Sequence, residues 1–134
     1  MHTHPIVVLS LGIILATVLG VTWAGEPERG EKEYLRFCAS CHGIDAKGNG
    51  TVSKLLLVKP TDLTLLKKNN KGVYPLDHVM SSIDGTRGVR GHGESNMPVW
   101  GEVFEKYDKK AKDPKLAAQL HVKVIAEYIS TLQP

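Results

Sequence analysis

The stretch that decides the fold is Cys38-Ala39-Ser40-Cys41-His42. Two thiols separated by two residues can each form a thioether with a vinyl group of haem, and the adjacent histidine can reach the iron from the same side. In a helical turn this spacing brings both sulfurs to one edge of the porphyrin and directs the next side chain at its centre. The pattern therefore predicts one covalently attached haem c, with Cys38 and Cys41 as attachment sites and His42 as an iron ligand.

Three other kinds of site use closely spaced cysteines. A thioredoxin-like dithiol requires a βαβ context, and no strand-like alternation occurs near Cys38. A zinc site requires about four ligands from separated pairs, and the sequence contains no second C-x-x-C and no H-x-x-x-H. A disulfide between Cys38 and Cys41 would close a very short loop and constrain the chain little. The spacing favours covalent haem over these three.

The N-terminal segment has the pattern of an export signal. Residues 1–25 contain no Asp, Glu, Lys or Arg, and the chain is almost wholly apolar from Ile6 to Val21. Small residues at the first and last positions of Thr22-Trp23-Ala24 predict a signal peptide over residues 1–24, cleaved after Ala24. The alternative is a retained anchor, because the apolar stretch approaches the ~20 residues of a membrane span. In either case we expect residues 25–134 to be exported to the periplasm, soluble or tethered to the outer face of the inner membrane.

Composition limits the function classes that remain. The chain has 134 residues, 17 Lys and Arg, 14 Asp and Glu, and a net charge of +3. This balance excludes a disordered polyelectrolyte and a multi-span membrane protein, and the charge excess is too small to indicate nucleic-acid binding. A mature region of this size corresponds to one domain, and small domains often rely on a bound group for stability.

The first helix is predicted between Glu28 and Cys38. Its apolar face carries Gly30, Tyr34 and Phe37 at positions i, i+4 and i+7. Gly30 leaves room for a second helix to cross closely, and we expect Tyr128 to pack there.

The last helix is predicted to begin at Asp113-Pro114, with aspartate as the N-cap and proline in the first turn, and to run for about 18 residues. Its apolar residues recur every four positions at Leu116, Leu120, Val124, Tyr128 and Leu132, with Ala117, His121, Ile125 and Ile129 alongside. His121 is expected on the flank of this helix.

Three shorter segments also have a helical period. One runs from Leu76 to Ile83 and is ended by Asp84-Gly85, another runs from Trp100 to Tyr107, and a turn covers Thr61 to Lys68. No segment shows sustained strand alternation. The predicted fold class is all-α, with about four to five helices around one haem and the N- and C-terminal helices packed against each other.

A second axial ligand must be a soft or imidazole donor on the opposite face of the haem. The candidates in the mature chain are Met80, Met97, His78, His92 and His121. Core packing explains Met80, and His78 points about 160° away from it on the same helix. Met97 lies in a segment without an apolar period, and Pro98 restricts it to extended geometry. These observations distinguish Met97 from the other candidates but leave Met97, Met80 and His92 open as the second ligand.

The mature chain resembles a small class I c-type cytochrome. The segments that carry the resemblance are Gly30-x-x-x-Tyr34, Cys38-x-x-Cys41-His42-Gly43, Gly48-Asn49-Gly50, Pro60-x-Asp62-Leu63-Thr64, Ile83-Asp84-Gly85, Asn96-Met97-Pro98-Val99-Trp100-Gly101 and Tyr128-Ile129-x-Thr131-Leu132. The haem-attachment motif is highly specific, and the other segments are individually weaker.

The resemblance implies an all-α fold wrapped around one haem, with His42 and Met97 as axial ligands. It also implies that the carbonyl of Pro60 accepts the Nδ1 hydrogen of His42, although a simple turn proline is an equal alternative. Trp100 is expected either to donate its indole N–H to a haem propionate or to pack in the core. Arg87 and Arg90 are candidates for the same propionates, or are solvated surface charges.

The implied function is electron transfer, because protein ligands on both sides of the iron leave no open site for oxygen or peroxide. We expect an electron carrier rather than an enzyme, with protein redox partners, and with the membrane involved only through a retained leader or a membrane-bound partner. Lysines near the Pro60 turn either steer an acidic partner or are ordinary solubilising charges. The alternatives are an electron-transfer subunit of a larger oxidoreductase, and a ligand-binding haem sensor or peroxidase-like protein.

Overall fold

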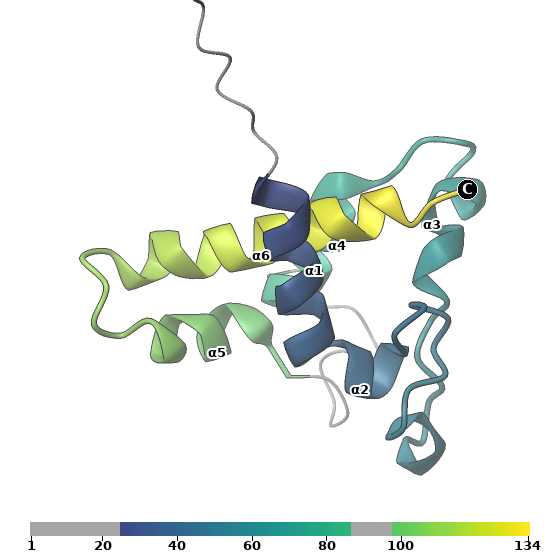
Figure 1. Cartoon of the computed structure of the whole chain (residues 1–134), viewed down its shortest axis with the longest axis horizontal. Helices are drawn as coiled ribbons and strands as arrows, with labels where there is room; N and C mark the ends of the chain where they lie inside the picture. Colours follow the sequence, from purple (N-terminus) through teal and green to yellow (C-terminus); the bar gives the residue numbers. More distant parts are fainter. Residues whose placement is uncertain (1–24, 87–97) are drawn as a thin grey trace, which may run out of the picture.

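A computed structural model of the chain describes residues 25–86 and 98–134, and all regular structure in these two ranges is helical (Figure 1). The elements are α1 (Gly25–Phe37), α2 (Ala39–His42), η1 (Ser53–Leu55), η2 (Leu63–Leu65), α3 (Leu66–Asn69), α4 (Leu76–Asp84), α5 (Trp100–Tyr107) and α6 (Pro114–Thr131), η marking 3₁₀ turns. The all-α prediction is confirmed for this part of the chain. None of the helices described is long and apolar enough to cross a bilayer. The predicted leader, residues 1–24, lies outside the described ranges.

The long helix α6 is the element on which the others pack. It contacts α1, α4 and α5 (Figure 1), so it forms one side of every major helix interface described. Its N-terminus follows the prediction: Asp113 is the N-cap and accepts a hydrogen bond from the backbone N–H of Leu116 at 3.0 Å, and Pro114 is the first helical residue. The helix has 18 residues, as predicted.

The crossing of α1 and α6 is built on Gly30. A Cβ at this position would overlap the carbonyl oxygen of Val124 and lie 2.8 Å from the Cβ of Tyr128. The absence of a side chain therefore lets the two helices approach closely. Beside the crossing, the rings of Tyr34 and Tyr128 lie with centroids 5.4 Å apart. The prediction that Gly30 receives a crossing helix at Tyr128 is confirmed.

The shorter helices also occupy their predicted positions. α4 ends at Gly85, which adopts a left-handed conformation with φ of 85°. Asp62 caps η2 by accepting a hydrogen bond from the N–H of Thr64 at 2.9 Å, and α3 follows directly. The core between α1, α4, α5 and α6 is centred on Tyr34, Phe104 and Ile125.

The buried face of α6 differs from the predicted stripe. Leu116 and Leu120 are exposed, whereas Val122, which was not expected on this face, is buried; Ile125 is buried as expected. A strict four-residue repeat advances about 40° around a helix at each step, so Leu116 and Leu132 lie on different sides. The prediction is wrong for the first half of the helix because the buried side there is set by α5 and not by the leucine repeat.

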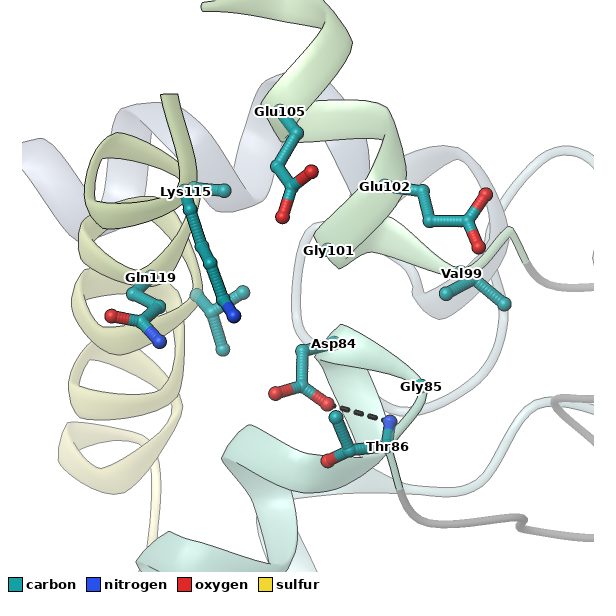
Figure 2. A pocket seen from close by; sticks show the side chains of 11 residues that line it. Asp84, Gly85, Thr86, Val99, Gly101, Glu102, Glu105, Lys115 and Gln119 are labelled. Carbon is teal, nitrogen blue, oxygen red and sulfur yellow. Dashed lines mark hydrogen bonds between the residues drawn. The ribbon is translucent and has the colours of Figure 1, made fainter. Parts of the chain in front are cut away.

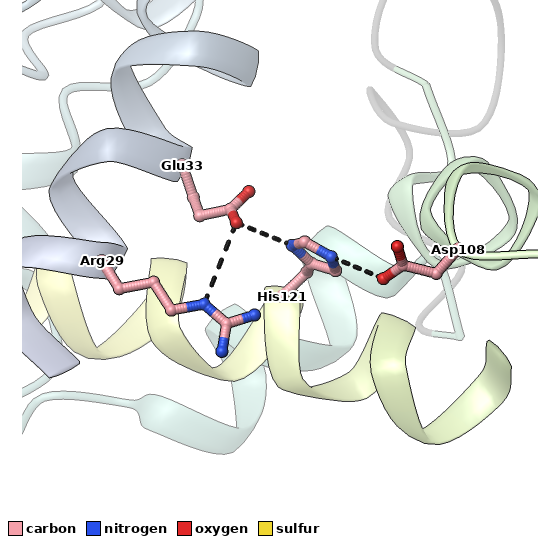
Figure 3. A network of polar contacts seen from close by, with 4 residues as sticks. All are labelled: Arg29, Glu33, Asp108 and His121. Carbon is pink, nitrogen blue, oxygen red and sulfur yellow. Dashed lines mark hydrogen bonds and ion pairs between the residues drawn. The ribbon is translucent and has the colours of Figure 1, made fainter. Parts of the chain in front are cut away.

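His121 is buried, which corrects its predicted place on the flank of α6. Its Nδ1 lies 3.0 Å from Oε1 of Glu33 on α1, and its Nε2 lies 2.8 Å from Oδ2 of Asp108 at the end of α5 (Figure 3). Its ring also stacks on Phe104, with centroids 4.8 Å apart. One carboxylate therefore lies beside each ring nitrogen of His121. The side chain thus ties three helices together.

Candidate functional site

The three residues of the attachment motif lie in one helical turn. Cys38 precedes α2, and its carbonyl accepts the N–H groups of Cys41 at 3.2 Å and of His42 at 2.9 Å. This turn continues from α1, since the N–H of Cys38 still bonds to the carbonyl of Tyr34 at 2.8 Å. The backbone from Cys38 to His42 therefore forms the helical turn that the spacing predicts.

The loop after His42 folds back on this turn and holds it. The hydroxyl of buried Tyr34 donates to the carbonyl of Gly43 at 2.7 Å. Gly43 has φ of 86°, a conformation that residues with a side chain rarely adopt. The N–H of Gly48 donates to the carbonyl of His42 at 2.7 Å, and the N–H of Gly50 donates to the carbonyl of Cys41 at 3.1 Å. The glycine-rich segment of the sequence thus acts as a brace for the motif.

An apolar cavity opens beside the motif. It has a volume of about 210 Å³ and is lined by Cys38, His42, Thr61, Leu63, Leu66, His78, Val79, Ser82, Ile83, Ile125 and Ile129. The six aliphatic side chains come from three separate parts of the chain: η2 with α3, α4, and the second half of α6. Ligand pockets are typically apolar with a few polar groups, at roughly 300–1,000 Å³, so the lining of this cavity is of that kind and its volume lies below that range.

The environment of Cys38 suits attachment better than thiol redox chemistry. Burial, with smaller contributions from Cys41 and Glu33, raises the pKa of Cys38 from 9.0 to about 12. A thiol with this pKa is protonated at neutral pH, whereas reactive dithiols depend on a lowered pKa. Cys38 and Cys41 are both free thiols here. The sulfur of Cys38 therefore lies in surroundings that favour an uncharged group.

Of the remaining predicted site residues, some lie within the described ranges and others do not. Trp100 packs edge-on against Phe37, with ring centroids 5.5 Å apart, and belongs to the partly buried shell of the core, which is the second of its two predicted roles. Pro60 lies outside the cavity lining, but its carbonyl is in contact with Gly48, next to the backbone of His42. Met97 and the other candidates within residues 87–97 (His92, Arg87 and Arg90) lie outside the described residues.

Met80 and His78, two of the candidates for the second ligand, have different surroundings in the structure. Met80 packs against the hydrophobic core, as expected from its place on the apolar face of α4. His78 lines the cavity together with His42. The expected angle of about 160° between Met80 and His78 accounts for this division. The helical period of the sequence places His78 and Met80 on different sides of α4. Only the tertiary structure shows that the side with His78 lines the same cavity as His42.

A second cavity of about 300 Å³ lies between α4, α5 and α6, and Figure 2 shows its polar lining. Asp84, Glu102, Glu105 and Lys115 extend toward it or around its rim, and the Oδ1 atom of Asp84 accepts the N–H of Thr86 at 2.7 Å. Neither cysteine nor His42 lines this cavity. Within the described ranges, no group of three or more His, Cys, Asp or Glu side chains is arranged to hold a metal ion.

Comparison with known proteins identifies no relative: no family model, no curated protein and no solved structure matches the chain.

Proposed function

We propose that this chain is an exported monohaem c-type cytochrome that carries single electrons between protein redox partners. The observation that carries the proposal is the position of Cys38 and His42 in one helical turn and on the wall of one apolar cavity. In the proposed arrangement the four helices α1, α4, α5 and α6 form a cytochrome c fold around the haem.

The donor set and the walls fit a porphyrin. Cys38 and Cys41 supply two thioether bonds and His42 supplies an imidazole nitrogen, which is the chemistry of c-type attachment. Leu63, Leu66 and the aliphatic residues of α4 and α6 supply apolar surface for the macrocycle. When bound, the haem supplies an iron that exchanges one electron between its ferric and ferrous forms.

The residues of the chain have separate roles in this function. His42 would hold the iron through its imidazole, and the brace from Gly43 to Gly50 fixes its backbone. Met97 would supply a thioether as the second ligand, a donor that favours the reduced state. The aliphatic walls would keep water away from the bound group. With both ligands supplied by side chains, the protein would act as an electron carrier and not as an enzyme.

An intact mass and an absorption spectrum of the protein exported by a host that matures c-type cytochromes test the attachment. We expect one haem per chain and removal of residues 1–24. Cys38→Ala combined with Cys41→Ala removes both bonds and should give a colourless product. A colourless preparation of the parent protein would refute the proposal.

Met97→Ala tests the second ligand, with Met80→Ala as the matched control. We expect the Met97 variant to lose the methionine–iron charge-transfer band of the oxidised protein and to bind carbon monoxide when reduced. The Met80 variant should keep the band. Carbon monoxide binding by the parent protein would favour a ligand-binding haem protein instead, and a stable association with a larger protein in native extract would favour an electron-transfer subunit.

A further inference from the structure

The segment between α2 and α3 carries an unusual group of exposed aliphatic side chains. Leu55 is 82% exposed, Leu57 is 91% exposed and Val58 is 63% exposed. These three residues are named here the apolar tip. Figure 1 shows that the segment extends away from the packed helices, with its 3₁₀ turn η1 at the far end. Aliphatic side chains that are this exposed at the end of a projecting loop are costly in water.

Lysines flank the apolar tip on both sides. Lys54 precedes it and Lys59 follows it, and both are exposed. Residues 44–73 as a whole contain six lysines and two aspartates, so this part of the chain accounts for all of the net positive charge of the protein.

The two aspartates of this segment are already engaged within it. Asp45 accepts hydrogen bonds from Nδ2 of Asn49 at 3.2 Å and from the backbone N–H of Lys47 at 3.3 Å. Asp62 accepts the N–H of Thr64 at 2.9 Å and its hydroxyl at 2.6 Å. The surface around the apolar tip therefore presents positive charge outward.

We propose that the apolar tip inserts into the interface of an anionic lipid bilayer, with Lys54 and Lys59 on the headgroups. Aliphatic groups that enter the acyl boundary beside lysines that reach the anionic headgroups are the pattern of peripheral membrane binding. Protein interfaces of stable complexes bury about 800 Å² on each partner and rely on aromatic and arginine anchors. The apolar tip has three aliphatic side chains and neither kind of anchor, so its composition fits a bilayer better than a protein partner.

This contact does not involve the leader, because it uses only side chains of residues 54–59. It brings the face bearing the segment between α2 and α3 onto the membrane, while the second cavity between α4, α5 and α6 is formed by other elements. A carrier held in this way would meet membrane-bound partners by diffusion along the surface.

Hydrogen–deuterium exchange of the exported full-length gene product tests the proposal locally. We expect slower exchange of residues 53–59 with vesicles of equal parts phosphatidylglycerol and phosphatidylcholine, and no slowing with phosphatidylcholine alone. Salt at about 1 M should reverse the effect, because it shortens the screening length to about 3 Å. Because the readout is confined to residues 53–59, a leader that anchors the chain elsewhere does not produce it. Absence of protection on anionic vesicles would overturn the proposal.

Leu57→Ser provides the decisive variant, and Val73→Ser, at a position that is 66% exposed outside the apolar tip, is its matched control. Loss of one inserted leucine should raise the lipid concentration needed for half-maximal protection about tenfold, whereas Val73→Ser should change it little. Both positions are exposed, so neither change is expected to unfold the domain, and exchange within α6 verifies this. Equal protection of parent and Leu57→Ser would refute insertion. Protection by a purified redox protein, with none on any vesicle, would make the surface a protein-docking site and would also refute it.

Discussion

Gly30→Ala tests the close crossing of α1 and α6. In an isolated helix this change is favourable by about 1 kcal/mol, because alanine has the higher helix propensity. In this protein the new methyl group would overlap the carbonyl oxygen of Val124 and lie 2.8 Å from the Cβ of Tyr128. Neither contact can be relieved by a side-chain rotation, since one partner is backbone and the other is a Cβ. The two helices must therefore separate.

The expected result is a net loss of stability. Overpacking a well-packed site costs about 1–3 kcal/mol, and the upper end applies here because two contacts must give way. After the gain in propensity, we expect the free energy of unfolding to fall by about 2 kcal/mol. For a domain of this size that corresponds to a decrease in Tm of roughly 10 °C.

Denaturant unfolding of the purified protein, followed by helical circular dichroism, measures this loss. Gly25→Ala is the matched control, because a Cβ at Gly25 meets nothing within 4 Å and lies on the same helix. We expect Gly25→Ala to be neutral or slightly stabilising. If Gly30→Ala is as stable as the parent, the helices do not approach as closely as described and the reasoning fails.

Three further predictions concern polar groups that the fold buries. His121→Ala leaves the carboxylates of Glu33 and Asp108 without the imidazole between them, and should lower the free energy of unfolding by about 2 kcal/mol or more; unchanged denaturation midpoints would show that the three groups do not interact. Tyr34→Phe removes the 2.7 Å hydrogen bond of a buried hydroxyl. It should lower the free energy of unfolding by about 1–2 kcal/mol in the same measurement. An unchanged value would show that water replaces the bond. In the chain without haem, the raised pKa of Cys38, about 12, means that the fold favours the neutral thiol. Its contribution is therefore complete below pH 9 and is lost as the pH rises from 9 toward 12; Cys38→Ala should make the alkaline decline of stability shallower, and an identical decline in both proteins would contradict this.

Much of the helical framework could be predicted because its signals are local. The start of α6 follows from Asp113 and Pro114, whose capping hydrogen bond and fixed backbone angle act within one turn. The end of α4 follows from Gly85, which alone tolerates the left-handed conformation there. Part of the candidate site could also be predicted from the sequence, because Cys38, Cys41 and His42 lie within one helical turn.

Other features could not be predicted because they depend on which helices meet. The burial of His121 requires α1 and α5 to converge on it from both sides. The exposure of Leu116 and Leu120 follows from the limited cover that α5 gives to the first half of α6. The exposure of the apolar tip could not be predicted either, because local sequence does not show whether another segment covers Leu55, Leu57 and Val58.

The sequence by itself determined the chemical groups of the candidate site, two thiols and an imidazole within one turn, because the spacing of Cys38, Cys41 and His42 is set by the covalent chain. Tertiary structure alone decided what surrounds that chemistry. Leu63, Val79 and Ile125 are far apart in the chain and reach the same cavity only because α4 and α6 pack together. The physical reason is that hydrophobic burial is non-directional and depends on the apolar area removed from water. That area is set by contacts between distant segments, which form only when the helices pack.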